Sequence, residues 1–168
     1  MKYSNFNDLD IIISNIGLGT EQFSRKWKQI SLSNIKKIIN VAFEEGINFI
    51  DTAECYGNHE SEKIIGELIN NRDKWIIASK FGHEFYKEKK INSFNLNSVK
   101  KQLNKSLNHL KTDYIDIYYF HSGNDNEFFN DDLWNYLNKQ VKIGKIRYLG
   151  LSLKHDLVTS KKLNAASS

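Results

Sequence analysis

Short apolar runs and amphipathic helical segments alternate along this chain from residue 30 onward. Strand-like runs begin at residues 47, 75, 115 and 146, which separates them by 28, 40 and 31 residues. This spacing is typical of successive βαβ units, whose strands form a parallel sheet. The run Ile115–Phe120 is apolar and aromatic except at Asp116, and it is expected to form a strand that is buried on both faces. The pattern therefore predicts an α/β fold.

Helical periodicity fills the intervals between these strands. Apolar residues at i, i+3, i+4, i+7 and i+8 predict a helix that begins at Ser31 or Ser33 and ends at Gly46. Three further helices are expected. One runs from about Ser61 to Ile69, one begins at a cap near Asn97 or Ser98, and one ends at Gly144.

Three other segments of the chain have predicted structures. An earlier strand is expected over residues 16–19, and residues 2–13 are expected to form a short hairpin that turns near Asp8. Residues 84–95, a polar stretch with three lysines, are expected to form a loop.

Composition excludes several classes of protein. The 168 residues carry a formal net charge of +4, but the basic residues are scattered among acidic ones, so no nucleic-acid partner is expected. No apolar run approaches the roughly 18 residues of a membrane span, so no membrane association is expected. Asp8 and Asp10 interrupt the only apolar stretch near the N-terminus, which argues against a secretory signal. The single cysteine, Cys55, fits a reducing compartment, and we expect a cytoplasmic protein.

Chemically capable residues follow the predicted strands. Asp51 and Tyr56 come after the second strand, Lys80 ends the third and His121 ends the fourth. The carboxyl ends of parallel strands lie at one face, where α/β proteins bind ligands. Each residue alone has a structural explanation as a turn, packing or strand-end residue. Four ionisable side chains at neighbouring strand ends favour a functional site.

This set of side chains suits proton donation by a phenol. A lysine ammonium beside Tyr56 stabilises the phenolate, and Asp51 can hold Lys80 in place. Tyr56 could then protonate a carbonyl oxygen while a hydride reaches the carbon, and His121 could hydrogen-bond the same oxygen. A different possibility is that Lys80 acts as a Schiff-base nucleophile, as in an aldolase.

Several motifs occur in an order that strongly resembles the aldo-keto reductase family. They are Ile16–Thr20, Glu45–Ala53 with Tyr56-Gly57 and Ser61-Glu62, Ala78–Lys80, Leu110–Asp116 with His121, and Gly144–Arg147 through Gly150–Ser152. The resemblance covers nearly the whole chain. It implies a (β/α)₈ TIM-barrel fold and NADPH-dependent reduction of an aldehyde or ketone, a small-molecule carbonyl substrate.

The resemblance also implies roles for particular residues. Asp51, Tyr56, Lys80 and His121 match the family's catalytic tetrad, with Tyr56 as the general acid. Gly19, Thr20, Asp51 and Ser152 match positions near the nicotinamide and its ribose. No metal site is predicted. The sequence departs from the family at two places. Leu153 stands where the family commonly has an asparagine that binds the nicotinamide carboxamide. The family usually has Pro-Asp shortly after the histidine, whereas this chain continues from His121 as Ser122-Gly123-Asn124-Asp125.

Length is the largest departure from the family. A full barrel needs about 250 residues, whereas residues 1–168 are expected to form a single partial domain of about strands one to five, preceded by the hairpin. The alternative to a reductase is therefore a truncated, non-catalytic fragment, or a binding or regulatory subunit unable to anchor the cofactor. Exposed edges of strands one and five are expected to favour self-association into a homo-oligomer.

Overall fold

A computed structural model describes residues 1–5, 9–24 and 30–153 of the chain. Within this part, five strands form a parallel sheet in the order β3–β4–β5–β8–β9. Their bounds are β3 Leu18–Gly19, β4 Phe49–Asp51, β5 Ile76–Phe81, β8 Ile115–His121 and β9 Ile146–Ser152. Neighbours in space are neighbours along the chain, as in a barrel of βα units. The predicted α/β class with a parallel sheet is confirmed, and the described strands leave the sheet open between β3 and β9.

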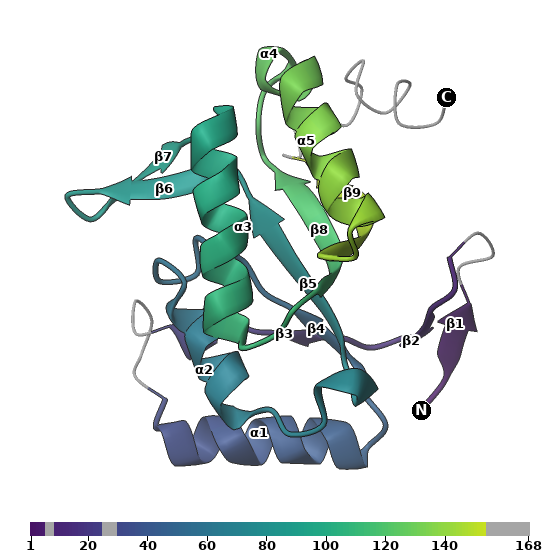
Figure 1. Cartoon of the computed structure of the whole chain (residues 1–168). Helices are drawn as coiled ribbons and strands as arrows, with labels where there is room; N and C mark the ends of the chain where they lie inside the picture. The colour runs from purple at the N-terminus through teal and green to yellow at the C-terminus, as the bar shows by residue number, and fades with distance from the viewer. Residues whose placement is uncertain (6–8, 25–29, 154–168) are drawn as a thin grey trace.

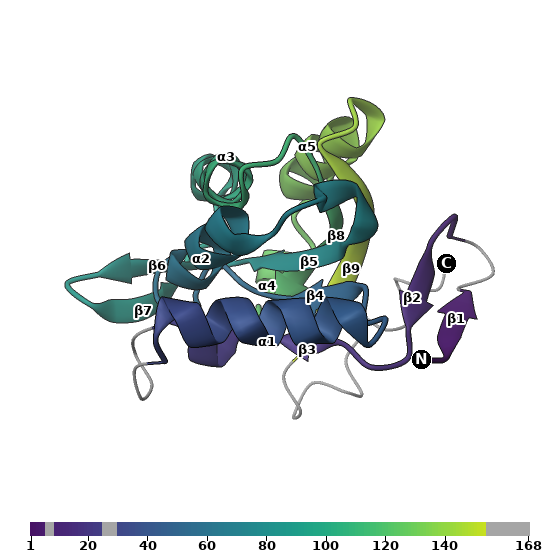
Figure 2. The ribbon, with the colours of Figure 1, turned by 90° about the horizontal axis from the view of Figure 1, so that it is seen from below.

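Helices connect these strands and follow one another around the outside of the sheet (Figures 1 and 2). Their bounds are α1 Leu32–Glu44, α2 Glu60–Leu68, α3 Leu96–Leu110, α4 Asp125–Phe128 and α5 Asp131–Lys142. Two short 3₁₀ helices, η1 Glu21–Phe23 and η2 Arg72–Lys74, lie after β3 and before β5. No helix in the described ranges has the length and apolar character that a bilayer span requires.

Polar side chains fix where the helices begin. Ser31 caps α1 by accepting a hydrogen bond from the amide of Asn34, which selects one of the two predicted caps. The cap of α3 is Asn95, two residues before the predicted position, and its side chain accepts from the amide of Ser98. Asparagine and serine are both common N-cap residues, so the sequence alone did not show which of Asn95, Asn97 and Ser98 caps α3.

Two hairpins stand at opposite ends of the molecule (Figures 1 and 2). The predicted N-terminal hairpin is confirmed: β1 Tyr3–Asn5 pairs antiparallel with β2 Ile12–Ser14, while the turn expected near Asp8 lies outside the described residues. Asn48, which precedes β4, accepts from the amide of Ser14 and donates to the carbonyl of Ile12. These bonds fix the hairpin beneath the amino end of the sheet.

The prediction of a loop over residues 84–95 is wrong for most of that segment. Instead, β6 His83–Tyr86 pairs antiparallel with β7 Lys89–Asn92. Lys87 and Glu88 form the connection and both have positive φ, of 45° and 65°. A two-residue hairpin turn requires this conformation, and asparagine and glycine are its usual sequence signal. Lysine and glutamate occupy those positions here, so the sequence contains no signal for a hairpin turn.

Side chains alternate between the two faces of each strand, so the apolar residues of the sheet divide into two clusters. Ile77 and Phe81 of β5 belong to the main core beneath the helices. Ala78 belongs to a second cluster on the inner face of the sheet, together with Ile117 of β8 and Ile13 of the N-terminal hairpin. Lys80 has the same parity as Ala78 in β5, so its side chain leaves the strand on the inner face. The carboxyl end of this inner face is where the candidate site lies.

Candidate functional site

Three of the four residues predicted to be catalytic are joined by hydrogen bonds at the carboxyl end of the sheet. Lys80 Nζ donates to Asp51 Oδ1 at 2.6 Å and to the Tyr56 hydroxyl at 3.2 Å. Asp51 ends β4, and Lys80 lies on the neighbouring strand β5. We refer to Asp51, Tyr56, Lys80 and His121 as the tetrad.

Lys80 is buried and fully hydrogen-bonded. Its side chain is 6% exposed, and its third donor bonds the carbonyl of Thr52 at 2.7 Å. An ammonium group has three donors, so none is left unsatisfied. Burial acts to lower the pKa of Lys80, but the charge and hydrogen bond of Asp51, followed by Tyr56, outweigh it and raise that pKa above its ordinary value. Lys80 is therefore a stable cation.

Tyr56 lies in the connection between β4 and α2. Gly57, with φ of +69°, turns the chain immediately after it, and an added Cβ there would lie 2.6 Å from the Cβ of Ser24. Burial, the largest effect, raises the pKa of Tyr56, while the charge and hydrogen bond of Lys80 lower it without reversing the direction. Because Lys80 donates to the phenolic oxygen, the hydrogen of Tyr56 remains free for an acceptor in the adjoining cavity.

His121 ends β8 and faces the same cavity as Tyr56. That cavity has a volume of about 190 Å³ and is lined by Glu21, Ser24, Cys55, Tyr56, Gly57, Lys90 and His121. Burial first, then the neighbouring His83, Lys80 and Lys90, lower the pKa of His121 to about 3. A neutral imidazole results, which retains one N–H donor. The structure thus brings all four predicted residues to one place.

The residues expected near a nicotinamide occupy different environments. Gly19 ends β3, and a Cβ added there would meet nothing within 4 Å, so open space adjoins its backbone. Ser152 ends β9 and is partly exposed. Thr20 is fully buried, and its hydroxyl donates to the carbonyl of Asp51 at 2.9 Å. Thr20 thereby braces the strand end that carries Asp51.

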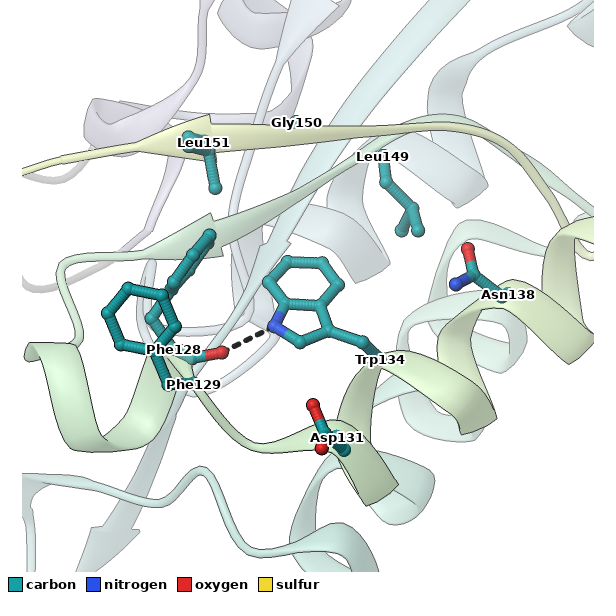
Figure 3. A pocket seen from close by; sticks show the side chains of 8 residues that line it. All are labelled: Phe128, Phe129, Asp131, Trp134, Asn138, Leu149, Gly150 and Leu151. Atoms are coloured by element: carbon teal, nitrogen blue, oxygen red, sulfur yellow. Dashed lines mark hydrogen bonds between the residues drawn. The ribbon is translucent and has the colours of Figure 1, made fainter. Parts of the chain in front are cut away.

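Larger cavities lie away from the tetrad. One of about 580 Å³ opens on the inner face of the sheet, beside the N-terminal hairpin. Another, of about 360 Å³, lies between β9 and the helices α4 and α5, and Figure 3 shows the indole of Trp134 in its wall, donating to the carbonyl of Phe128. Neither cavity is lined by a tetrad residue. The cavity of about 190 Å³ is the one of these three that adjoins the tetrad.

Sequence reasoning missed two groups of buried charges, one beside the site and one at the amino end of the sheet. Glu54 is 1% exposed and accepts from the amide and the Nδ1 of His83, at 2.9 and 3.1 Å. Asp116 is also 1% exposed and accepts from Arg72 at 2.7 Å and from Arg147 at 2.9 Å. The partners in each group are 29 to 44 residues apart, so no local spacing relates them. The signal present was an acidic residue inside an apolar strand, as at Asp116.

Comparison with known proteins agrees with this geometry. The model of the aldo/keto reductase family matches residues 15–165. The chain is 32% identical over 171 residues to the aryl-alcohol dehydrogenase [NADP(+)] of Phanerodontia chrysosporium, covering 92% of this chain and 44% of the relative. It is 31% identical over 156 residues to the aldo-keto reductase YhdN of Bacillus subtilis, covering 90% of this chain and 47% of the relative.

A solved structure gives the same result. The holo form of the aldo-keto reductase AKR11C1 from Bacillus halodurans superposes with a TM-score of 0.86 at 28% identity, covering 98% of this chain and 54% of that one. The chain thus spans about half the length of the relatives that it matches. From the family match, the shared barrel strands and the motif order, this chain belongs to the aldo/keto reductase family.

Proposed function

We propose that this chain carries the proton-donating half of an NADPH-dependent carbonyl reductase, in which Tyr56 is the general acid. The observation that carries the proposal is the hydrogen bond from Lys80 to the Tyr56 oxygen, in which the phenol accepts and so keeps its own hydrogen for donation. The family is named for the reduction of aldehydes and ketones, and the fungal relative, an aryl-alcohol dehydrogenase, is named for NADP(+).

The residues at the strand ends fit a nicotinamide cofactor in two respects. Gly19 leaves open space beside its backbone at the carboxyl end of β3, and the side chain of Asp51 is 35% exposed beside it. We propose Gly19, Thr20, Asp51 and Ser152 as the cofactor-binding residues, with Thr20 acting through its bond to the Asp51 carbonyl. When bound, reduced nicotinamide would supply the hydride that reaches the carbonyl carbon.

The chain's own residues account for the accompanying proton transfer. The neutral imidazole of His121 donates its N–H to the substrate oxygen and orients the carbonyl in the cavity. Tyr56 gives its phenolic proton to that oxygen as negative charge develops there, which yields the alcohol. The ammonium of Lys80 stabilises the resulting phenolate, and Asp51 holds the ammonium in place. A proton from solvent then restores Tyr56.

The charge state of Lys80 argues against an aldolase-like role. A Schiff-base lysine attacks as the free amine and needs a lowered pKa. Asp51 and Tyr56 raise the pKa of Lys80 instead, and three acceptors hold its protons.

A second candidate function is that of a binding or regulatory subunit without turnover. The observation behind it is that the chain spans 44% and 47% of these relatives, whose remaining length can hold part of the cofactor. The two candidates differ in a single measurable property, which is turnover that depends on Tyr56.

The test combines cofactor binding with turnover. NADPH fluorescence is titrated with the purified chain, and NADPH oxidation is followed with a simple aldehyde. For Tyr56→Phe we expect binding to be retained and turnover to fall by about 100-fold or more, the usual contribution of a general acid. Tyr86→Phe, an identical change at an exposed hairpin residue, should leave both unchanged.

Each outcome favours one candidate. Binding without turnover in the unmodified chain favours the subunit, and turnover that survives Tyr56→Phe removes Tyr56 from the proposed role. Absence of NADPH binding contradicts the reductase function for this chain.

A further inference from the structure

A group of four metal-ligating side chains adjoins the tetrad. Glu54, Cys55, His83 and His121 each place one ligand atom within 4.8 Å of the others. We call these residues the Cys–His group. Within the described ranges, no second group of three or more such side chains has this geometry. Only His121 is shared with the tetrad.

Hydrogen bonding fixes the ring of His83 for this purpose. Its Nδ1 lies 3.1 Å from Glu54 Oε1, which also accepts from the His83 amide. With Glu54 Oε1 as the partner of Nδ1, Nε2 is the ring nitrogen of His83 that is left for a metal. A carboxylate bonded to one nitrogen of a histidine is the usual means of orienting the other nitrogen toward a metal.

The second carboxylate oxygen of Glu54 is an independent indication of a ligand. Glu54 is 1% exposed, yet its Oε2 has no hydrogen-bond partner within the part of the chain that the structure describes. Buried polar atoms in native proteins are nearly always satisfied, and an unpartnered carboxylate oxygen is costly. A cation in the Cys–His group would satisfy it.

The remaining two ligands face an open route. Cys55 Sγ lies 3.8 Å from His121 Nδ1. Both residues line the cavity of about 190 Å³ that also admits solvent to Tyr56. An ion can therefore reach the Cys–His group without unfolding the sheet. Lys90 lines the same cavity, and its positive charge opposes cation entry.

We propose that Glu54, Cys55, His83 and His121 form a binding site for a divalent transition metal of the Zn²⁺ type. One thiolate, two imidazoles and one carboxylate suit this borderline-soft ion. Metal–ligand distances of about 2.0–2.3 Å place tetrahedral ligands roughly 3.3–3.8 Å apart, so the group contracts by about 1 Å on binding. The Cys55 thiol releases its proton to solvent, and the thiolate and carboxylate together neutralise the metal's charge.

The site would regulate the neighbouring chemistry. A bound metal occupies the imidazole of His121, which faces the same cavity as Tyr56. Metal and carbonyl substrate are therefore expected to exclude each other. Metal binding itself is measured without turnover, so the proposed site stands or fails separately from the proposed reductase function.

The experiment titrates the purified full chain with Co²⁺ and follows its absorption spectrum. We expect about one Co²⁺ per chain, with the charge-transfer absorption of a cobalt–thiolate bond, displaced by Zn²⁺. Cys55→Ser should abolish that absorption and weaken Zn²⁺ binding by at least about 100-fold, more than the loss of an outer partner. His83→Gln should weaken binding similarly, whereas Lys90→Gln should strengthen it a few-fold.

A matched variant controls for the loss of any histidine. His109→Gln removes an imidazole that packs against His59, outside the Cys–His group, and should bind Co²⁺ as the unmodified chain does. Circular dichroism checks that each variant is folded, and Cys55→Ser carries the test should His83→Gln fail to fold. Absence of the thiolate absorption, or equal Zn²⁺ affinity in Cys55→Ser, overturns the proposal.

Discussion

Lys80 Nζ lies 2.6 Å from Asp51 Oδ1, and this ion pair joins two neighbouring strands at the mouth of the candidate site. The lysine is almost completely buried, whereas the carboxylate is about one-third exposed. Removing the carboxylate would therefore leave a buried cation, while removing the lysine would leave an acid that water can still reach. The two residues consequently differ in what their loss should do.

We predict that Lys80→Met lowers the rate of carbonyl reduction by at least about 100-fold, the scale of general acid catalysis. Lys80 lowers the pKa of Tyr56 by its charge and hydrogen bond, so its loss leaves burial to raise that pKa further. Steady-state kinetics with NADPH and a simple aldehyde measure the effect. Lys74→Met, at a side chain that is 64% exposed, is the control and should retain the original rate. A Lys80→Met enzyme within a few-fold of that rate would contradict the prediction.

Asp116→Ala should destabilise the fold by about 3 kcal/mol, the lower end of the usual cost of breaking a buried ion pair. Its carboxylate is 1% exposed and accepts from Arg72, Arg147 and the amide of Ile77. Loss of the acid leaves two guanidinium groups without their counter-charge beneath the sheet.

Urea unfolding measures this change. Asp73→Ala, which removes an acid that is 73% exposed and lies 3.8 Å from Lys74, should alter stability by less than about 0.5 kcal/mol. Equal midpoints for Asp116→Ala and Asp73→Ala would show that the buried cluster contributes nothing.

The chain should lose stability as the pH falls through the range below 6.5. Burial and neighbouring cations hold the pKa of folded His121 at about 3, against 6.5 for an unperturbed histidine. Between these values the unfolded chain binds a proton that the folded chain does not, so acid favours unfolding. The contribution of the neutral His121 to the free energy of unfolding is fully present above pH 6.5 and decreases as the pH falls toward 3.

Unfolding midpoints between about pH 4 and pH 8 test this dependence. His121→Gln should show a shallower decline in acid than the unmodified chain. His109→Gln should retain most of the decline, because the pKa of His109 is lowered mainly by its own burial and does not depend on His121. Identical pH profiles for the unmodified chain and His121→Gln would refute the assignment.

Self-association is the fourth prediction. Within the described residues, β3 and β9 each have one neighbour in the sheet, and an unpaired edge is a template for another chain. Leu149 and Leu151 of β9 line the apolar cavity in front of Trp134 (Figure 3). Light scattering should detect dimers or larger species, and Leu151→Lys should shift them toward monomer. A monomer at all concentrations would contradict this expectation.

The sheet could be predicted from the sequence because each strand and helix has a strong local signal. Ile115–Phe120 is apolar and aromatic at every position except Asp116, and the strand that starts at Ile146 begins where predicted. The second and third strands begin one or two residues after their predicted starts, at Phe49 and Ile76. Apolar residues that precede a strand look the same in sequence as those within it.

Local signals were insufficient for the hairpin β6–β7 and for α4. The hairpin's turn at Lys87 and Glu88 lacks the glycine or asparagine that usually identifies one. Helix α4 spans only Asp125–Phe128, too short for periodicity, although Asn124 and Glu127 form a capping box at its start.

The placement of the tetrad could be predicted because parallel strands align their carboxyl ends, whereas its surroundings could not. Nothing local relates Glu54 to His83, 29 residues away, or Cys55 to His121, 66 residues away. The direction of the Tyr56 pKa shift also depends on burial, which the sequence does not specify. The Cys–His group forms only when three separate segments, which carry Glu54 with Cys55, His83 and His121, come together in space.

The sequence separations between contacting residues of the site indicate an order for its assembly. Lys80 reaches Asp51 and Tyr56 across 29 and 24 residues, whereas Cys55 meets His121 across 66. Closing the longer loop costs about 1 kcal/mol more chain entropy, and a growing chain releases its N-terminal residues first. On a ribosome, the acid and its lysine can therefore assemble before the histidine that completes the pocket has been synthesised.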